Sequence, residues 1–163
     1  PDVLYISDIR ERETMEAALL AAEAGQLVLS CIHTTNVVTT VERFIAFFPA
    51  HQHHLIRLRL SLVLRGIVSL RRLMRSDGSG RIPACEILVS TPRVKELLRE
   101  GHTGQRPEAL QDGAMFGMQT FTQALYQRYR QGEVTLEEAL KYADSPEELQ
   151  LAIREIRPTR DVQ

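Results

Sequence analysis

The sequence contains little of what marks several classes of protein. Its 163 residues include two cysteines, Cys31 and Cys85, too few for a disulfide framework or a four-cysteine zinc site. Both lie in apolar segments, and we expect them to be reduced core residues of a cytosolic protein. The formal net charge is −1, so the basic excess typical of nucleic-acid-binding proteins is lacking. No stretch approaches the roughly 20 apolar residues of a membrane-spanning helix, so we expect no direct insertion into a membrane.

A further absence concerns nucleotide binding. No segment has the G-x-x-x-x-G-K-[ST] spacing of a phosphate-binding loop. Gly78-Ser79-Gly80-Arg81 does not replace it, because this stretch joins two predicted strands rather than preceding a helix. The chain also starts at Pro1, without a Met, just before an apolar run. We therefore expect a piece of a longer protein, in which a phosphate-binding loop would lie upstream.

The first third of the sequence alternates strand and helix patterns. Residues 3–6 are an apolar run, residues 11–24 repeat apolar side chains at helical spacing, and residues 26–32 are again a mainly apolar run. Such runs are typical of buried parallel strands joined by a helix. A right-handed crossover would bring the ends of both strands to one edge of a sheet. Asp8 and His33, which follow the two strands, would then face the same crevice.

The remainder of the sequence predicts helices and one β-hairpin. Residues 34–36 supply caps for a helix that ends before Pro49, and residues 51–65 form a basic amphipathic helix. Residues 66–75 and 81–89 are the predicted hairpin strands, joined by a turn-rich loop. The start signals of the later helices are Thr91-Pro92, Thr135 with Glu138, and Ser145 with Glu148.

Two polar residues at the strand ends each have two interpretations. Asp8 either caps the next helix, where Asp is favoured, or acts as a general base or water-orienting group in phosphoryl transfer. His33 is either a structural histidine or, beside Asp8 and the hydroxyls that follow it, a group that contacts a phosphate. The residues alone leave these alternatives open.

Histidines and arginines gather between residues 51 and 75. His51 and His54 have helical i, i+3 spacing, but no carboxylate completes a ligand set, so we predict no metal site. We expect most of the arginines to be solvated or to form ion pairs between subunits rather than to bind nucleic acid. These arginines are Arg57, Arg59, Arg65, Arg71, Arg72 and Arg75.

Four motifs, in order, resemble those of the type IV pilus retraction ATPases, the PilT/PilU group of hexameric secretion-superfamily motors. PDVLYISDIR at residues 1–10 is similar to their Walker B segment PDVILxGEIRD, and AAEAGQLV followed by IHTT at residues 21–35 is similar to their His box. TPRVKELLREG at residues 91–101 is a variant of the retraction motif AIRNLIRE, and GMQTF at residues 117–121 matches GMQTFD. The resemblance extends to about residue 150. The lack of a four-cysteine motif favours the retraction group over pilus-extension and type II secretion relatives.

The resemblance implies an α/β fold. We expect a partial RecA-like P-loop NTPase domain, with a parallel sheet, flanking helices and a β-hairpin, followed by a C-terminal helical subdomain. Residues 1–90 would be the carboxyl-terminal part of the ATPase core, residues 91–157 the helical subdomain and residues 158–163 a tail. The resemblance also implies a cytoplasmic protein at the cytoplasmic face of the inner membrane. It would form a homo-hexamer or a hetero-assembly with a paralogous ATPase and contact an inner-membrane pilus platform protein.

The resemblance further implies roles for individual residues. Asp8 and His33 would be catalytic: Asp8 would position the attacking water, and His33 would contact the γ-phosphate. The cofactors would be ATP and Mg²⁺, both of which require upstream residues absent from this chain. The predicted nucleotide-binding residues are Arg10, Gln26, His33 and Thr34. The predicted retraction-motif residues are Leu97, Arg99 and Glu100.

Three substitutions depart from the family pattern: Asp8 stands where the family has Glu, Ser7 where it has the preceding Gly, and Gln26 where it has His. Asp is one methylene shorter, and a misplacement of about 1 Å can cost on the order of 100-fold in rate. The implied function is a subunit of a motor that hydrolyses ATP to power pilus retraction and twitching motility; without a Walker A loop, we expect this chain alone to be inactive. There are two alternatives. One is a catalytically degenerate PilU-like partner subunit; residues 12–16 and 138–145 favour the PilU-like branch of the family. The other is a non-enzymatic helical interaction module.

Overall fold

The computed structural model describes residues 1–101 and 113–155. The chain forms two compact units: unit 1 comprises residues 1–69 and 87–118, and unit 2 comprises residues 70–86 and 119–163. This division differs from the predicted boundary after residue 90. Helix α4 (Pro92–Glu100) belongs to unit 1, whereas the middle of the hairpin belongs to unit 2. That residues 91–157 act together as one helical subdomain stays a prediction.

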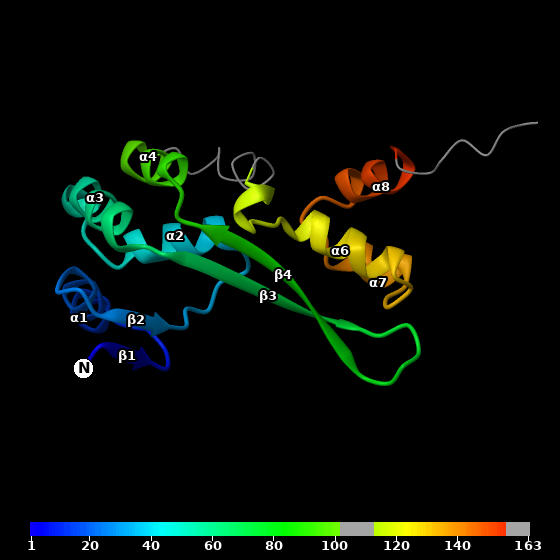
Figure 1. Ribbon diagram of the computed structural model, residues 1–163, viewed down its shortest axis with the longest axis horizontal. Helices are drawn as coiled ribbons and strands as arrows, with labels where there is room; N and C mark the ends of the chain where they lie inside the picture. The colour runs from blue at the N-terminus through cyan, green and yellow to red at the C-terminus, as the bar shows by residue number, and fades with distance from the viewer. Residues whose placement is uncertain (102–112, 156–163) are drawn as a thin grey trace, which may run out of the picture. The chain divides into compact units, whose positions relative to one another are not determined.

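Unit 1 alternates strands and helices as the sequence predicts. Strands β1 and β2 pair in parallel, with Val3 opposite Leu27 and Ile6 opposite Ser30 (Figure 1). The elements besides α4 are β1 (Val3–Ile6), α1 (Arg12–Glu23), β2 (Leu27–Ser30), α2 (Val37–Ala46), the 3-10 helix η1 (Ala50–Gln52), α3 (His53–Val63) and the 3-10 helix η3 (Ala114–Phe116). The two strands of the hairpin contribute residues to both units; they are β3 (Gly66–Met74) and β4 (Arg81–Val89).

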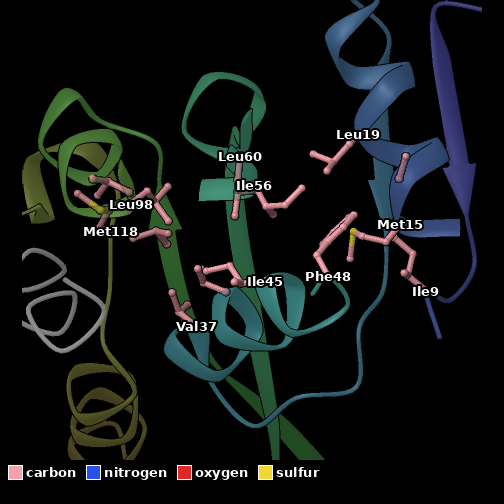
Figure 2. Packing of buried hydrophobic residues seen from close by; sticks show 14 residues of the cluster. Ile9, Met15, Leu19, Val37, Ile45, Phe48, Ile56, Leu60, Leu98 and Met118 are labelled. Atoms are coloured by element: carbon pink, nitrogen blue, oxygen red, sulfur yellow. The ribbon is translucent and has the colours of Figure 1, made fainter. Parts of the chain in front are cut away.

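The core of unit 1 is built from helix positions four residues apart. Such positions lie on one face of a helix, so each helix buries one stripe. Figure 2 shows part of this cluster, with Phe48 reaching from the end of α2 into the space between α1 and α3. The buried pairs are Met15 and Leu19 of α1, Val41 and Ile45 of α2, Ile56 and Leu60 of α3, and Val94 and Leu98 of α4.

The prediction that β1 and β2 are buried strands is wrong for this chain. Successive side chains of a strand point to opposite faces of the sheet. Ile6 and Val28 lie on the face that packs against the helical core. The other face is exposed to between 46% and 68%, and its residues are Val3, Tyr5, Leu27 and Leu29.

The same alternation explains the cysteines. Cys31 continues the register of Leu27 and Leu29 on the exposed face and is itself exposed, while Cys85 is half-buried. The prediction of two core cysteines is therefore wrong. An apolar neighbourhood along the chain does not reveal which face a strand residue occupies.

Unit 2 combines the tip half of the hairpin with three short helices, α6 (Phe121–Arg130), α7 (Leu136–Lys141) and α8 (Pro146–Glu155). The predicted start signals are confirmed. Thr135 Oγ1 accepts a hydrogen bond from Glu138 N at 3.2 Å, and Ser145 Oγ accepts one from Glu148 N at 3.3 Å. The buried residues of this unit include Leu73, Ile82, Leu125 and Leu149. In residues 1–101 and 113–155, no helix is long and apolar enough to cross a membrane.

Three of the six arginines between residues 57 and 75 form ion pairs inside the chain: Arg59 and Arg71 form close pairs, and Arg75 lies 3.8 Å from Asp77 in the hairpin turn. Arg59 of α3 bonds Glu16 at 2.8 Å and Glu23 at 2.6 Å, both on α1. These bonds lower the pKa of Glu23 and raise the pKa of Arg59. Arg71 of β3 is 14% exposed and bonds Asp144 at 2.6 Å. Arg59 and Arg71 thus each connect two segments of their own unit.

Candidate active site

Asp8 and His33 meet beyond the carboxyl ends of β1 and β2, as the sequence predicts. His33 Nε2 lies 3.3 Å from Asp8 Oδ2. The backbone N–H of Ile9 donates to the carbonyl of Cys31 at 3.1 Å, which extends the pairing of the two segments past the strand ends. Because parallel strands end at the same sheet edge, and ligands of open α/β folds bind there, this pair lies where a ligand site is expected.

The carboxylate of Asp8 is held through one of its two oxygens. Arg10 Nε donates to Oδ2, the oxygen that His33 also approaches. The hydrogen bond from Arg10, with a further contribution from His33, holds the pKa of Asp8 below its usual range. The helix-cap interpretation of Asp8 is wrong, because the N-cap residue of α1 is Glu11.

The second oxygen of Asp8 has a different environment. Oδ1 is buried and, within the part of the chain that the structure describes, accepts no hydrogen bond. The Asp8 side chain is 18% exposed, whereas His33 is 81% exposed. A buried acceptor without a donor gains from a water molecule or from a water bound to a cation. This oxygen therefore fits the water-orienting role and the neighbourhood of a hydrated Mg²⁺. Among the described residues, no three His, Cys, Asp or Glu side chains gather as a direct metal-ligand set.

The segment that carries His33 is fixed by a network at the start of α2. Asn36 Oδ1 accepts from Thr39 N at 2.8 Å, and Thr39 Oγ1 accepts from Asn36 N at 3.1 Å, which closes a capping box. Thr34 Oγ1 lies 2.6 Å from Thr40 Oγ1, whose hydroxyl also donates to Asn36 O. Sequence reasoning predicted Thr34 as a nucleotide contact but missed Thr40, because a six-residue spacing is no helical signal.

The structure does not bring Gln26 to this cluster. Gln26 precedes β2, whereas His33 follows it, and four strand residues at about 3.3 Å each separate the two ends. The Gln26 side chain instead donates to the carbonyl of Pro1 at 2.9 Å. Arg10 belongs to the cluster through Asp8, and its own side chain is 76% exposed.

The three predicted retraction-motif residues do not share one surface. Leu97 is 1% exposed, because it lies one helical turn after buried Val94 on the core face of α4. The prediction that Leu97 forms part of a surface is therefore wrong. Arg99 and Glu100 are exposed, and Arg99 Nε donates to Ser61 Oγ of α3 at 3.3 Å.

Comparison with known proteins identifies the family. The model of the family described as "Type II/IV secretion system protein" matches residues 1–141. The chain belongs to this family. Within it, the chain is 43% identical over 154 residues to the type IV pilus ATPase PilU of Pseudomonas aeruginosa, which covers 94% of the chain and 40% of PilU. It is 36% identical over 147 residues to the type IV pilus retraction ATPase PilT of the same organism, covering 90% of the chain and 42% of PilT.

A solved structure extends the family comparison to three dimensions. The pilus retraction motor PilT with bound ADP matches with a TM-score of 0.84 and 38% identity, over 93% of this chain and 42% of that one. The Legionella pneumophila ATPase DotB shares the fold, with a TM-score of 0.71. The predicted resemblance to the retraction ATPases and the partial α/β ATPase fold are confirmed. The chain spans about two fifths of the length of these family members.

Proposed function

We propose that this chain is part of a motor subunit that hydrolyses ATP to power type IV pilus retraction, and with it twitching motility. The observation that carries the proposal is the Asp8–His33 pair, 3.3 Å apart beyond the ends of two parallel strands. The names of its relatives support it, since PilU and PilT are both type IV pilus ATPases. The chain covers about two fifths of the length of these relatives, so we expect the phosphate-binding loop to belong to a part of the motor that this chain does not match, and the chain alone to be inactive.

The environment of Asp8 favours a water-orienting role over full proton abstraction. Bound ATP with Mg²⁺ supplies the phosphoryl group and the charge neutralisation of the reaction. Asp8 Oδ1, buried and without a hydrogen-bond partner in the described residues, accepts from the attacking water. A carboxylate whose pKa is lowered by Arg10 is ionised at neutral pH but is a weak proton acceptor. His33, which is 81% exposed, would contact the γ-phosphate when the nucleotide is bound.

The partners and the location follow from the same family relationship. We infer a homo-hexamer or a hetero-assembly with a paralogous ATPase, at the cytoplasmic face of the inner membrane and in contact with a pilus platform protein there. The exposed apolar face of β1 and β2 supports burial against further protein, because contiguous apolar faces of this kind mark interaction surfaces. Arg99 and Glu100, both exposed near the end of α4, are the retraction-motif residues that we expect to contact a partner.

The second candidate function is a degenerate partner subunit that assembles with an active motor. The Asp at position 8 favours it, because its carboxylate reaches about 1 Å less far than the family Glu. The third, a non-enzymatic helical module, has weaker support. Helix α4 belongs to unit 1 and helices α6, α7 and α8 belong to unit 2, so the helices after residue 91 do not form one unit.

Steady-state ATP hydrolysis by the full-length protein tests these alternatives. In an active motor, Asp8→Asn should lower the rate by roughly 100-fold or more, while Asp2→Asn, at the other end of β1, should leave it unchanged. A wild type that is inert but gains activity with Asp8→Glu would identify a degenerate subunit. A wild type that turns over equally well with Asp8→Asn would refute the role of Asp8.

A further inference from the structure

Two threonine hydroxyls beside His33 form a hydrogen-bonded chain whose direction can be assigned. A carbonyl oxygen accepts hydrogen bonds and never donates them. Thr40 Oγ1 lies 2.7 Å from the carbonyl oxygen of Asn36, so the single hydroxyl hydrogen of Thr40 lies in this contact. Thr34 Oγ1 lies 2.6 Å from Thr40 Oγ1. Because the Thr40 hydrogen is already used, Thr34 donates this second bond, and the chain runs from Thr34 to Thr40 to Asn36.

This direction limits what Thr34 offers to a nucleotide. A hydroxyl group has one hydrogen to donate, whereas the oxygens of a phosphate accept hydrogen bonds and need donors. The Thr34 hydrogen is bonded to Thr40, so Thr34 can donate to a phosphate only by giving up a bond within its own segment. The bonding of Thr34 therefore favours a role in holding that segment over direct contact with a phosphate.

The hydroxyl chain anchors the residue after His33 to the first turn of α2. Thr40 lies in that turn, and its backbone N–H donates to the same Asn36 carbonyl at 3.0 Å. Thr34 and Thr40 are both half-buried, which strengthens the bond between them. The ring of His33 is 81% exposed, and its 3.3 Å contact with Asp8 is longer than a typical hydrogen bond to a charged group. The orientation of His33 thus depends mainly on how its backbone is held.

The neighbouring Thr39 bonds the same carbonyl but serves a different purpose. Its Oγ1 donates to Asn36 O at 3.0 Å and accepts from Asn36 N at 3.1 Å, as part of the capping box. The same oxygen lies 3.4 Å from Thr35 Oγ1. Thr39 therefore stabilises the start of the helix, whereas Thr40 joins that start to Thr34. The two adjacent threonines separate helix capping from the anchoring of the His33 segment.

We propose that Thr40 is a positioning residue of the nucleotide site: by accepting the Thr34 hydroxyl, it holds His33 in the orientation that contacts Asp8 and the γ-phosphate. The inference rests on the proposed function, in which His33 contacts the γ-phosphate. Thr40 acts through Thr34, so substitutions at the two positions should not be additive. ATP carries the γ-phosphate and ADP lacks it, so loss of the Thr40 hydroxyl should change the affinity for ATP alone.

Binding of a non-hydrolysable ATP analogue and of ADP, each with Mg²⁺, to the full-length protein tests the inference. Thr40→Val removes the hydroxyl and keeps the branched shape of the side chain. It should weaken binding of the ATP analogue about three- to tenfold, the usual effect of one lost hydrogen bond, and leave the ADP affinity unchanged. Thr40→Ser keeps the hydroxyl and should restore the wild-type affinity. Thr34→Val should match Thr40→Val, and the double variant should bind no more weakly than either.

Thr39→Val is the matched control, because it removes a neighbouring hydroxyl that bonds the same carbonyl. It should lower the thermal stability of the helix start without changing the ratio of the two affinities. An equal change of that ratio with Thr39→Val would assign the effect to helix capping and overturn the inference. Additive effects of Thr34→Val and Thr40→Val, or an equal loss of ADP binding, would also overturn it.

Two further arms keep the test decisive. If Thr40→Val does not fold, Thr34→Val takes its place, since it removes the same bond from the other side. If the wild type binds neither nucleotide, the proposed function fails, and hydrogen exchange followed by mass spectrometry then decides the role of Thr40. Faster exchange of the backbone amides of residues 33–35 in Thr40→Val, but not in Thr40→Ser, would support the anchoring role. Equal exchange in wild type and Thr40→Val would refute it.

Discussion

Arg71 contacts several segments of unit 2, and we expect the stability of that unit to depend on it. Its guanidinium lies 3.8 Å from the centre of the Phe121 ring, donates to the Tyr142 carbonyl at 2.5 Å and pairs with Asp144 at 2.6 Å. These contacts join β3 to α6 and to the segment between α7 and α8. Because the side chain is 14% exposed, the contacts form in a largely desolvated environment. We therefore expect Arg71 to contribute more than a surface ion pair.

The substitution Arg71→Met keeps most of the aliphatic stem and removes the charge. A hydrogen bond from a charged group to a carbonyl contributes about 1.5 to 3 kcal/mol. A largely desolvated cation–π contact adds about 1 to 2 kcal/mol, and the pair with half-exposed Asp144 adds less than about 1 kcal/mol. Allowing for the contacts that Met retains, we expect the free energy of unfolding to fall by about 3 kcal/mol.

Urea unfolding followed by tyrosine fluorescence measures this loss. The chain has no tryptophan, and three of its four tyrosines, Tyr126, Tyr129 and Tyr142, lie in unit 2, so the signal reports mainly on that unit. Arg72→Met is the matched control, because Arg72 is the exposed neighbour on β3; its effect should stay within about 0.5 kcal/mol. A loss below about 1 kcal/mol for Arg71→Met, or equal losses for both variants, would refute the reasoning.

Two further predictions concern unit 1. Arg59→Gln should lower the free energy of unfolding by about 1 to 2 kcal/mol, since the paired carboxylates are partly exposed. The pKa of Glu23 is lowered from its ordinary 4.5 in the folded state, so the loss of unfolding free energy relative to wild type should be full above pH 4.5 and shrink as the pH falls below it. Urea titrations at several pH values measure this loss, and a loss that grows towards acid pH would contradict the prediction. Leu97→Ala should cost about 2 to 5 kcal/mol and Arg99→Ala less than about 1 kcal/mol in thermal unfolding, whereas similar losses would mean that Leu97 is not a core residue.

Features set by neighbouring residues could be predicted from the sequence. The order of strands and helices, the hairpin and the caps at Asn36 and Thr91 depend on spacing within a few positions, and the structure confirms them. The Asp8–His33 pair could also be predicted, because a short crossover between parallel strands places their ends together.

Features set by distant residues could not be predicted. Whether Leu29 is buried depends on what covers the second face of the sheet, and a short apolar run carries no information about that. The partners of Arg71 lie 71 and 73 positions away, so its place in a row of arginines resembled that of a solvated residue. Long-range contacts of this kind have no local spacing signal.

The asymmetry of the Asp8 carboxylate connects the fold to the proposed chemistry. Arg10 comes two positions after Asp8, so its contact with Oδ2 is set by the local chain, while His33 reaches the same oxygen only because β2 lies beside β1 in register. The parallel pairing therefore decides which oxygen is occupied and leaves Oδ1 without a hydrogen bond in the described part of the chain. A shorter carboxylate held firmly in this way offsets part of the reach lost relative to Glu, since a fixed orientation is itself a large part of catalysis. On this argument the Asp at position 8 is compatible with hydrolysis as long as the contacts of Arg10 and His33 persist in the complete nucleotide site.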